Sequence, residues 1–80
     1  MTKIVVYSQP GCGKCRATER LLELHKTPFD TVDIREKPEY IDILKAHGYR
    51  ETPVVFVKND DGTIADEWCG FHPEKIKEYV

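Results

Sequence analysis

The stretch KIVVYSQPGCGKCRATERLL (Lys3–Leu22) joins an apolar run to two cysteines and then to a helical pattern. The β-branched run Lys3–Tyr7 stops shortly before a Pro-Gly pair, which is typical of a strand that is buried on both faces. Arg16–His25 places leucines among arginine, glutamate and threonine, which is the composition of an amphipathic helix packed on a sheet. The stretch therefore predicts a strand, a turn and a helix that begins at the two cysteines.

Three more strands and two more helices are predicted downstream. Phe29–Ile34 alternates between apolar and polar residues, as a half-buried strand does. Pro38–Gly48 begins with a proline suited to a first helical position and ends with a glycine suited to a helix cap. Pro53–Val57 and Thr63–Trp68 flank an Asp-Gly turn, which is a strong signal for a hairpin. A last helix is predicted to start at Pro73 and to offer one face formed by Ile76, Tyr79 and Val80.

The order of these elements is βαβαββα, which indicates the α/β class. A helix that connects the first two strands makes them parallel, and the hairpin then adds two antiparallel strands. We expect a four-stranded mixed sheet with three helices that cover both of its faces. The 80 residues are enough for one domain and too few for two, so residues 1–80 are predicted to form a single domain.

Composition and charge narrow the class of partner. The formal net charge is −2, the sequence pI is about 5.9 and the lysines and arginines are scattered, so nucleic acid is not an expected partner. No signal-peptide pattern follows Met1, and no apolar stretch approaches the length of a membrane span. We expect a cytoplasmic monomer that does not bind membranes.

The sequence contains three cysteines, and an odd number in a reducing compartment argues against a permanent disulfide framework. A redox role or a metal site is then expected. At the start of a helix, unpaired N–H groups and the helix dipole favour a thiolate at Cys12 and can lower a cysteine pKa from about 8.5 to roughly 3.5–7.5. Cys15 lies one turn further along the same face, close enough for a disulfide but deeper.

This difference predicts a dithiol exchange in which the two cysteines have separate roles. The Cys12 thiolate would attack a partner's disulfide, and Cys15 would release the reduced partner by closing the Cys12–Cys15 bond. The chain would act as a thiol-disulfide oxidoreductase that carries electrons, with no cofactor besides this disulfide, and a reductase would reopen the bond. Lys14 adds a positive charge that favours the thiolate, unless it is an ordinary solvated surface residue.

Two further segments, GYRETPVV (Gly48–Val55) and WCGFHPEKI (Trp68–Ile76), resemble the NrdH-redoxin branch of the glutaredoxins. The first strand and its CxxC pair also resemble a glutaredoxin, so the resemblance covers nearly the whole chain. It implies a thioredoxin-like fold, thioredoxin reductase as the electron donor and class Ib ribonucleotide reductase as the electron acceptor.

Within this resemblance, Cys12 would be the attacking thiol and Cys15 the resolving thiol. Thr52-Pro53 matches the family's cis-proline dipeptide, whose turn would leave the Thr52 backbone free to pair with an extended segment of a partner. The aromatic segment that the family places near the active site is matched by Trp68, Gly70, Phe71 and Pro73. The two aromatic residues of this segment could instead be ordinary core residues.

Three positions depart from the family pattern. A small hydroxyl residue is replaced by Cys69, an arginine by His72, and the basic residue that often precedes the CxxC pair by Gln9. The last two changes count against binding of glutathione, although a glutathione-dependent glutaredoxin stays as an alternative with the same fold. For Cys69 we expect a small, partly buried side chain with no catalytic duty.

A zinc-binding module is the alternative from another class. Cys12-x-x-Cys15 and Cys69-x-x-His72 together supply four zinc ligands with suitable local spacing, and zinc would account for all three thiols. A structural zinc site normally belongs, however, to a domain too small to fold otherwise. This chain has four apolar strands and three amphipathic helices, which favours the redox interpretation. The remaining histidines, His25 and His47, are expected to be solvated.

Overall fold

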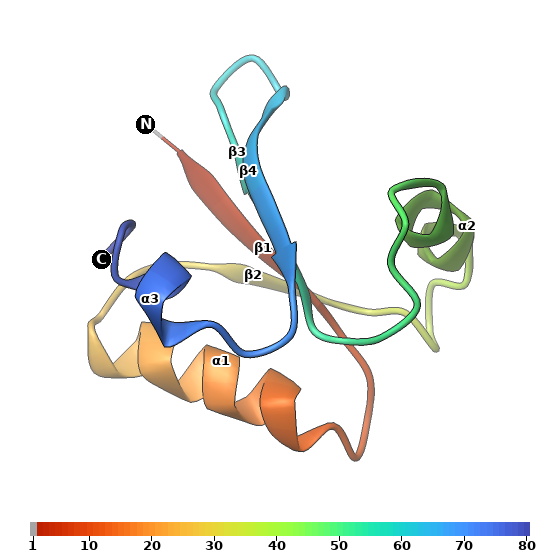
Figure 1. Cartoon of the computed structure of the whole chain (residues 1–80), viewed down its shortest axis with the longest axis horizontal. Helices are drawn as coiled ribbons and strands as arrows, with labels where there is room; N and C mark the ends of the chain where they lie inside the picture. The colour runs from red at the N-terminus through yellow and green to blue at the C-terminus, as the bar shows by residue number, and fades with distance from the viewer. Residues whose placement is uncertain (1) are drawn as a thin grey trace.

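Four strands form one mixed sheet in the computed structural model, which describes residues 2–80 (Figure 1). Their bounds are β1 Lys3–Ser8, β2 Asp30–Asp33, β3 Val54–Lys58 and β4 Ile64–Cys69. The strand order is β2-β1-β3-β4, in which β1 is parallel to β2, and β3 is antiparallel to both β1 and β4. The predicted mixed sheet is confirmed, with β2 and β3 each within one residue of the expected ends.

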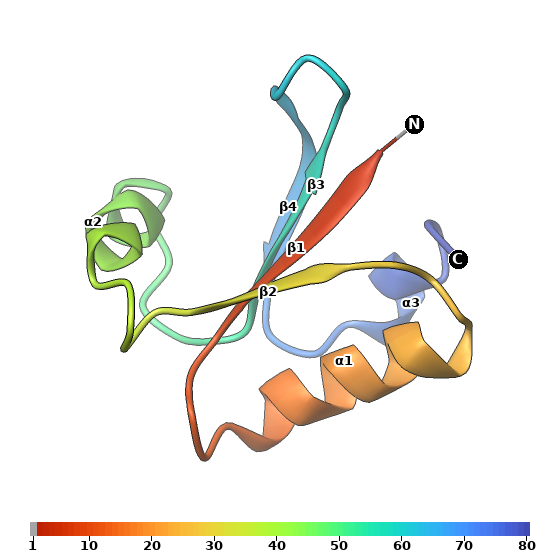
Figure 2. The ribbon, with the colours of Figure 1, turned by 180° about the vertical axis from the view of Figure 1, so that it is seen from behind.

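Three helices cover the two faces of the sheet. Their bounds are α1 Gly13–Leu24, α2 Glu39–Ala46 and α3 Pro73–Ile76. Helices α1 and α3 lie together on one face, and α2 lies on the other, as both views of the ribbon show (Figures 1 and 2). The predicted order βαβαββα and the placement of helices on both faces are therefore confirmed. Within residues 2–80, none of these helices is long and apolar enough to cross a membrane.

Strand β1 divides the apolar core into two clusters because its successive side chains point to opposite faces. On the side of α1 and α3, Ile4 and Val6 pack with Leu22, Val55, Val57, Trp68 and Ile76. On the side of α2, Val5 and Tyr7 pack with Leu44, Val54 and Phe56. All four of these β1 side chains are buried, as the continuous apolar run predicted.

Two helix boundaries differ from the sequence expectation. Pro38 is the N-cap of α2 and not its first helical residue, since the helix begins at Glu39. Helix α3 ends already at Ile76. Tyr79 stacks on Trp68 and donates a hydrogen bond to Asp66, whereas Val80 is 44% exposed. The predicted face of Ile76, Tyr79 and Val80 is thus wrong in its last member.

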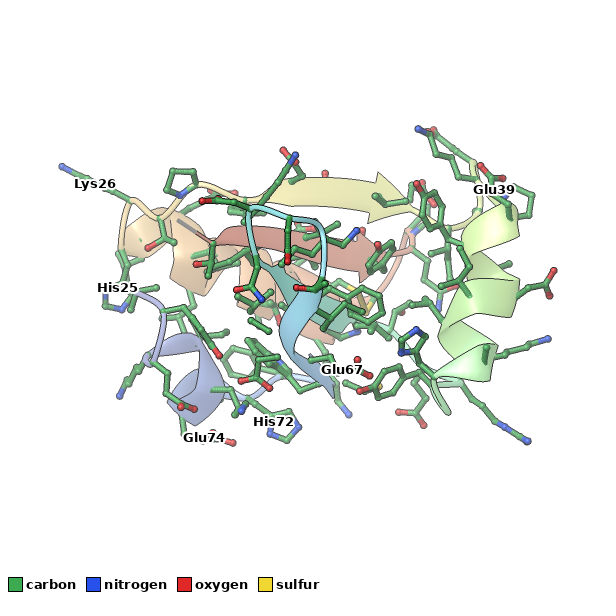
Figure 3. The ribbon with its side chains drawn as sticks, turned by 90° about the horizontal axis from the view of Figure 1, so that it is seen from above. His25, Lys26, Glu39, Glu67, His72 and Glu74 are labelled. Atoms are coloured by element: carbon green, nitrogen blue, oxygen red, sulfur yellow. A yellow bond between two sulfur atoms is a disulfide. The ribbon has the colours of Figure 1, made fainter. Side chains whose placement is uncertain are left out.

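Contacts with Glu67 join the end of α2 to strand β4. The Glu67 side chain projects from β4 toward α2 and accepts hydrogen bonds from His47 Nδ1 at 3.3 Å and from the Tyr49 hydroxyl at 2.8 Å (Figure 3). Burial and this hydrogen bond to Glu67 raise the pKa of Tyr49 to about 12, so the phenol stays protonated. Leu44 is the one buried residue of α2. His47 is exposed as expected, but it also contacts Phe56.

Candidate functional site

Cys12 lies at the N-terminal end of α1, directly after the turn that follows β1. It is the N-cap of the helix, and its sulfur accepts a hydrogen bond from the Cys15 backbone N–H at 3.1 Å. Cys12 and Cys15 form a disulfide, with their Cα atoms 5.2 Å apart. An N-cap sulfur faces the positive end of the helix dipole, which stabilises negative charge on it after the disulfide is reduced.

The two cysteines differ in their access to solvent. Cys12 is half-buried, whereas Cys15 is only 2% exposed and belongs to the face of α1 that packs on the sheet. An incoming disulfide can therefore reach the Cys12 sulfur more readily than the Cys15 sulfur. This is the arrangement that an attacking thiol and a resolving thiol require.

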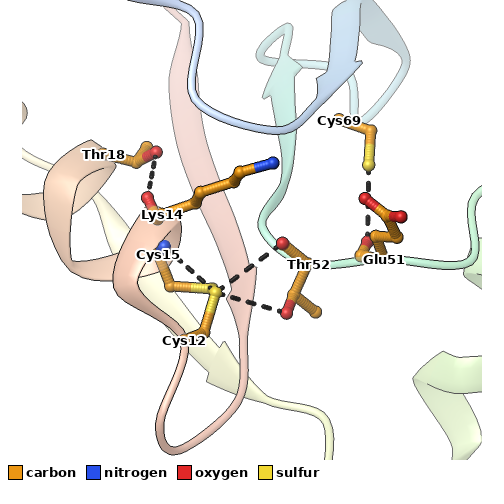
Figure 4. The surroundings of a disulfide bond; sticks show 7 residues. All are labelled: Cys12, Lys14, Cys15, Thr18, Glu51, Thr52 and Cys69. Carbon is orange, nitrogen blue, oxygen red and sulfur yellow. Dashed lines mark hydrogen bonds between the residues drawn. A yellow bond between two sulfur atoms is a disulfide. The ribbon is translucent and has the colours of Figure 1, made fainter.

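Thr52 brings two polar groups to the Cys12 sulfur from a distant part of the sequence. The Thr52 hydroxyl donates toward Cys12 Sγ at 3.5 Å, and the Thr52 carbonyl oxygen lies 3.6 Å from the same sulfur (Figure 4). The Thr52–Pro53 peptide bond is cis, as the sequence resemblance implied. Within residues 2–80, the Thr52 backbone makes no hydrogen bond to another backbone group, so it is available to an extended partner segment.

A backbone hydrogen bond connects the residue after β4 to the Thr52–Pro53 loop. The Gly70 N–H donates to the Pro53 carbonyl oxygen at 2.8 Å, and Gly70 has a φ of 92°, in the left-handed region that favours glycine. This turn separates the two aromatic residues of the segment. Trp68 is 7% exposed and packs in the core against α1 and α3, while Phe71 is 38% exposed beside α1. The structure therefore brings Gly70 and Phe71 to the surface and places Trp68 beneath them as a core residue.

Lys14 follows Cys12 by two residues and has an exposed side chain. Its side chain extends toward Thr52 and Cys69, across the gap between α1 and the loop before β3 (Figure 4). A partner docked over Cys12 would meet this positive charge.

Cys69 ends β4 and lies on the far side of the Thr52 loop from Cys12 (Figure 4). Its thiol donates to the Glu51 carbonyl oxygen at 3.4 Å. Burial and the nearby Glu51 charge raise the pKa of Cys69, and the positive charge of Lys14 offsets only part of this effect. Because the thiolate is the reactive form, a thiol with a raised pKa is a poor nucleophile at neutral pH.

The four residues suggested for zinc do not come together. His72 directs its Nδ1 at Glu74 and its Nε2 at the Cys69 carbonyl oxygen, each at 2.9 Å, and Figure 3 shows His72 and Glu74 side by side. Cys12 and Cys15 are bonded to each other. In the part of the chain that the structure describes, no three metal-ligating side chains form a group. The zinc alternative is therefore not supported, because matching local spacings on two segments do not aim four side chains at one point.

Besides the hollow lined by Cys12 and Cys15 themselves, the structure has two further hollows nearby that sequence reasoning missed. One has a volume of about 460 Å³ and contains Gln9 and Thr52 together with Lys45, Tyr49 and Glu51. The other lies along α1 and contains Arg16, Arg20 and Leu24. The signal for the second was present in the sequence, since positions three or four apart share one face of a helix.

Comparison with known proteins identifies the family. Residues 4–61 match the sequence model of the family Glutaredoxin. The chain is 32% identical over 74 residues to the glutaredoxin-like protein NrdH of Escherichia coli K12, which covers 92% of this chain and 84% of that protein. It is 30% identical to the NrdH protein of Lactococcus lactis subsp. lactis IL1403, over 91% of this chain and 93% of that protein.

The fold of this chain also matches that of a solved NrdH structure. The solved structure of NrdH-redoxin from Escherichia coli superposes with a TM-score of 0.85 at 31% identity, covering 98% of this chain and 95% of that one. The match includes the four-stranded sheet and the three helices described above. This chain therefore belongs to the glutaredoxin family, in its NrdH-redoxin branch, as a thioredoxin-fold oxidoreductase built around the Cys12–Cys15 pair.

Proposed function

We propose that this protein is a dithiol electron carrier that reduces disulfides in other proteins. The observation that carries the proposal is the unequal placement of the two sulfurs, with Cys12 accessible at the helix N-cap and Cys15 buried behind it. Residues 1–80 would act as a single cytoplasmic domain and a monomer, without a further cofactor.

The exchange takes two steps that balance in atoms and electrons. The Cys12 thiolate attacks one sulfur of the partner's disulfide, forming a mixed disulfide and expelling the partner's other sulfur as a thiolate, which takes up a proton. Cys15 then gives up its proton and attacks Cys12 Sγ, forming the Cys12–Cys15 bond and releasing the partner's second sulfur. Two electrons have passed to the partner, and a reductase must return two to this protein.

Several residues around Cys12 would hold the partner during the exchange. The Thr52 backbone would pair with an extended partner segment beside Pro53, while Gly70 and Phe71 would form the neighbouring contact surface. Lys14 would place its positive charge next to the same segment. Trp68 would contribute indirectly, by supporting this surface from the core.

Thioredoxin reductase is the proposed electron donor, and class Ib ribonucleotide reductase the proposed acceptor. The related Escherichia coli NrdH-redoxin is a glutaredoxin-like protein with a thioredoxin-like activity profile, which supports the choice of donor. The presence of Gln9 and His72 in place of basic residues also disfavours glutathione as the donor.

A coupled assay tests the donor directly. Oxidation of NADPH is followed with this protein and an oxidised protein substrate, once with thioredoxin reductase and once with glutathione and glutathione reductase. We expect fast turnover in the first system and slow turnover in the second. Faster turnover with glutathione at physiological concentration would assign the protein to the glutathione-dependent glutaredoxins instead.

A further inference from the structure

An open groove with a volume of about 670 Å³ runs along α1, between the helix and Phe71. The chain after β4 passes alongside α1 in this region before it enters α3 (Figure 1). The groove is lined chiefly by Gly13, Arg16, Ala17, Arg20, Leu24 and Phe71. It starts next to the reactive cysteine, because Gly13 immediately follows Cys12.

The helical residues of this groove form one stripe. Gly13, Arg16, Arg20 and Leu24 recur every three or four positions, so they lie above one another on the same face of α1. At 1.5 Å per residue the stripe is about 16 Å long, which is the length of about five residues of extended chain. The groove is open at the Cys12 end, since a Cβ built on Gly13 would have no atom within 4 Å.

Apolar side chains of this groove are unusually exposed. Leu24 is 74% exposed, the highest value for a large apolar side chain within residues 2–80, and Phe71 is 38% exposed. Both line the groove, whereas the opposite face of α1 is the one that packs on the sheet. An apolar side chain of a partner could cover Leu24 and Phe71 and gain free energy from the apolar surface that it removes from water.

The positive charges of the groove favour a partner that carries carboxylates. Arg16 and Arg20 are exposed and form no ion pair with any residue in the range 2–80. The acidic residues of the same helix, Glu19 and Glu23, do not line this groove, although Glu19 shares with Arg16 the smaller hollow beside Cys12 and Cys15. The protein as a whole carries a net charge of −2, so two unpaired arginines on one stripe form a local positive feature. Guanidinium groups bind carboxylates with paired hydrogen bonds.

We propose that this groove binds the segment of a substrate protein that adjoins the substrate's reactive cysteine. The segment would be extended and acidic, with an aliphatic side chain against Leu24 and Phe71 and carboxylates against Arg16 and Arg20. The inference rests on the proposed function, because it supplies the substrate selectivity of the same dithiol exchange. A partner would then contact the Thr52 backbone beside Cys12 and also this groove, which extends from Cys12 along α1.

Two oxidised peptides with the same internal disulfide test the groove. One continues from its second cysteine with alternating Glu and Leu, and the other with alternating Lys and Leu. The ratio of their kcat/KM values is measured for the wild type and for Arg20→Glu. Arg35→Glu is the matched control, because Arg35 is an exposed arginine between β2 and α2 that lines none of the grooves described here.

The wild type should prefer the acidic peptide by about fivefold, as expected for exposed ion pairs. Arg20→Glu should abolish or invert this preference, and Arg35→Glu should keep it. Leu24→Ser should raise KM for both peptides. Equal wild-type rates for the two peptides, or equal effects of both arginine variants, would overturn the groove assignment.

A neutral small substrate separates this inference from the proposed function. All variants are assayed with 2-hydroxyethyl disulfide, which is too small to occupy the groove. If the variants reduce this disulfide at normal rates and the wild type does not prefer the acidic peptide, the groove assignment is refuted while the dithiol function stands. No reduction of either kind of disulfide by the wild type would instead refute the dithiol function on which the inference rests.

Discussion

The hydroxyl of Thr52 lies 3.5 Å from the sulfur of Cys12, although 40 positions separate the two residues in the sequence. The hydroxyl is within donor distance of the sulfur, while the Thr52 carbonyl oxygen lies 3.6 Å from the same sulfur. A donor in this position stabilises the sulfur when it carries negative charge, which it does before it attacks and again when it leaves the mixed disulfide.

Replacing Thr52 by valine keeps the shape of the side chain but removes the donor. We expect the reduced Thr52→Val protein to react with iodoacetamide about fivefold more slowly at neutral pH, as the loss of one hydrogen bond implies. The pH profile of the reaction should move to higher pH. Thr52→Ser retains the hydroxyl and serves as the control. Alkylation of Thr52→Val at the wild-type rate would show that the hydroxyl does not act on the sulfur.

The two cysteines should give different phenotypes. Cys12→Ser should abolish reduction of a protein disulfide, because the accessible sulfur is lost. Cys15→Ser should instead trap the substrate as a mixed disulfide through Cys12, since no buried thiol can release it. Non-reducing gel electrophoresis and mass spectrometry detect the adduct. Equal residual turnover in the two variants would contradict the assigned roles.

Cys69 should be dispensable for the exchange. Burial and Glu51 raise the pKa of this thiol, so it should remain protonated and slow to react at neutral pH. Cys69→Ser should therefore keep the steady-state rate of disulfide reduction. Peptide mapping of the oxidised wild type should find the Cys12–Cys15 bridge and little else. A dominant bridge to Cys69 would assign this residue a redox role.

Asp66 should make stability depend on pH. Its carboxylate accepts hydrogen bonds from Lys75 Nζ at 2.6 Å and from the Tyr79 hydroxyl at 2.7 Å, and these bonds lower its pKa. A carboxyl whose pKa is lower in the folded state stabilises the fold above its unfolded pKa of about 3.9, and this contribution is lost as the pH falls through the folded value.

Thermal unfolding followed by circular dichroism tests this dependence. Asp66→Asn should lower the midpoint at pH 7 relative to the wild type, and the difference should shrink at pH 3 or below. Glu36→Gln is the control, since Glu36 lies in an exposed turn and its side chain has no ion pair within residues 2–80. A difference between Asp66→Asn and the wild type that is the same at both pH values would exclude the charged form as the cause.

The strands, the first helix and the CxxC pair were predictable because local sequence dominates them. The run from Ile4 to Tyr7 is buried on both faces, so it contains no polar residue, and this pattern has few other interpretations. Cys12 was placed at the start of a helix for a similar reason, since a Pro-Gly turn precedes it and a helical pattern follows.

Other features depend on contacts between distant segments. The sequence does not reveal that Trp68 is buried while Phe71 is exposed, because the left-handed turn at Gly70 decides on which side each ring lies. The sequence also does not reveal that α3 ends at Ile76 and that Tyr79, beyond the helix, contacts Trp68 and Asp66 of β4. The zinc alternative is not supported for the same reason. The spacing of ligands within one segment does not determine whether side chains from two distant segments point at one another.

The single buried side chain of α2 has a consequence for local stability. Helix α1 packs on the sheet through three buried side chains, Cys15, Thr18 and Leu22. Helix α2 packs through buried Leu44, through the partly buried Tyr40 ring against Tyr7, and through the contacts of its end with Glu67. In native-state hydrogen exchange, the amides of α2 should exchange through a local opening of low free energy. The amides of α1 should exchange only through an unfolding that has a much higher free energy. Such an opening would widen the hollow beside Thr52 while the sheet and the Cys12–Cys15 pair stay in place.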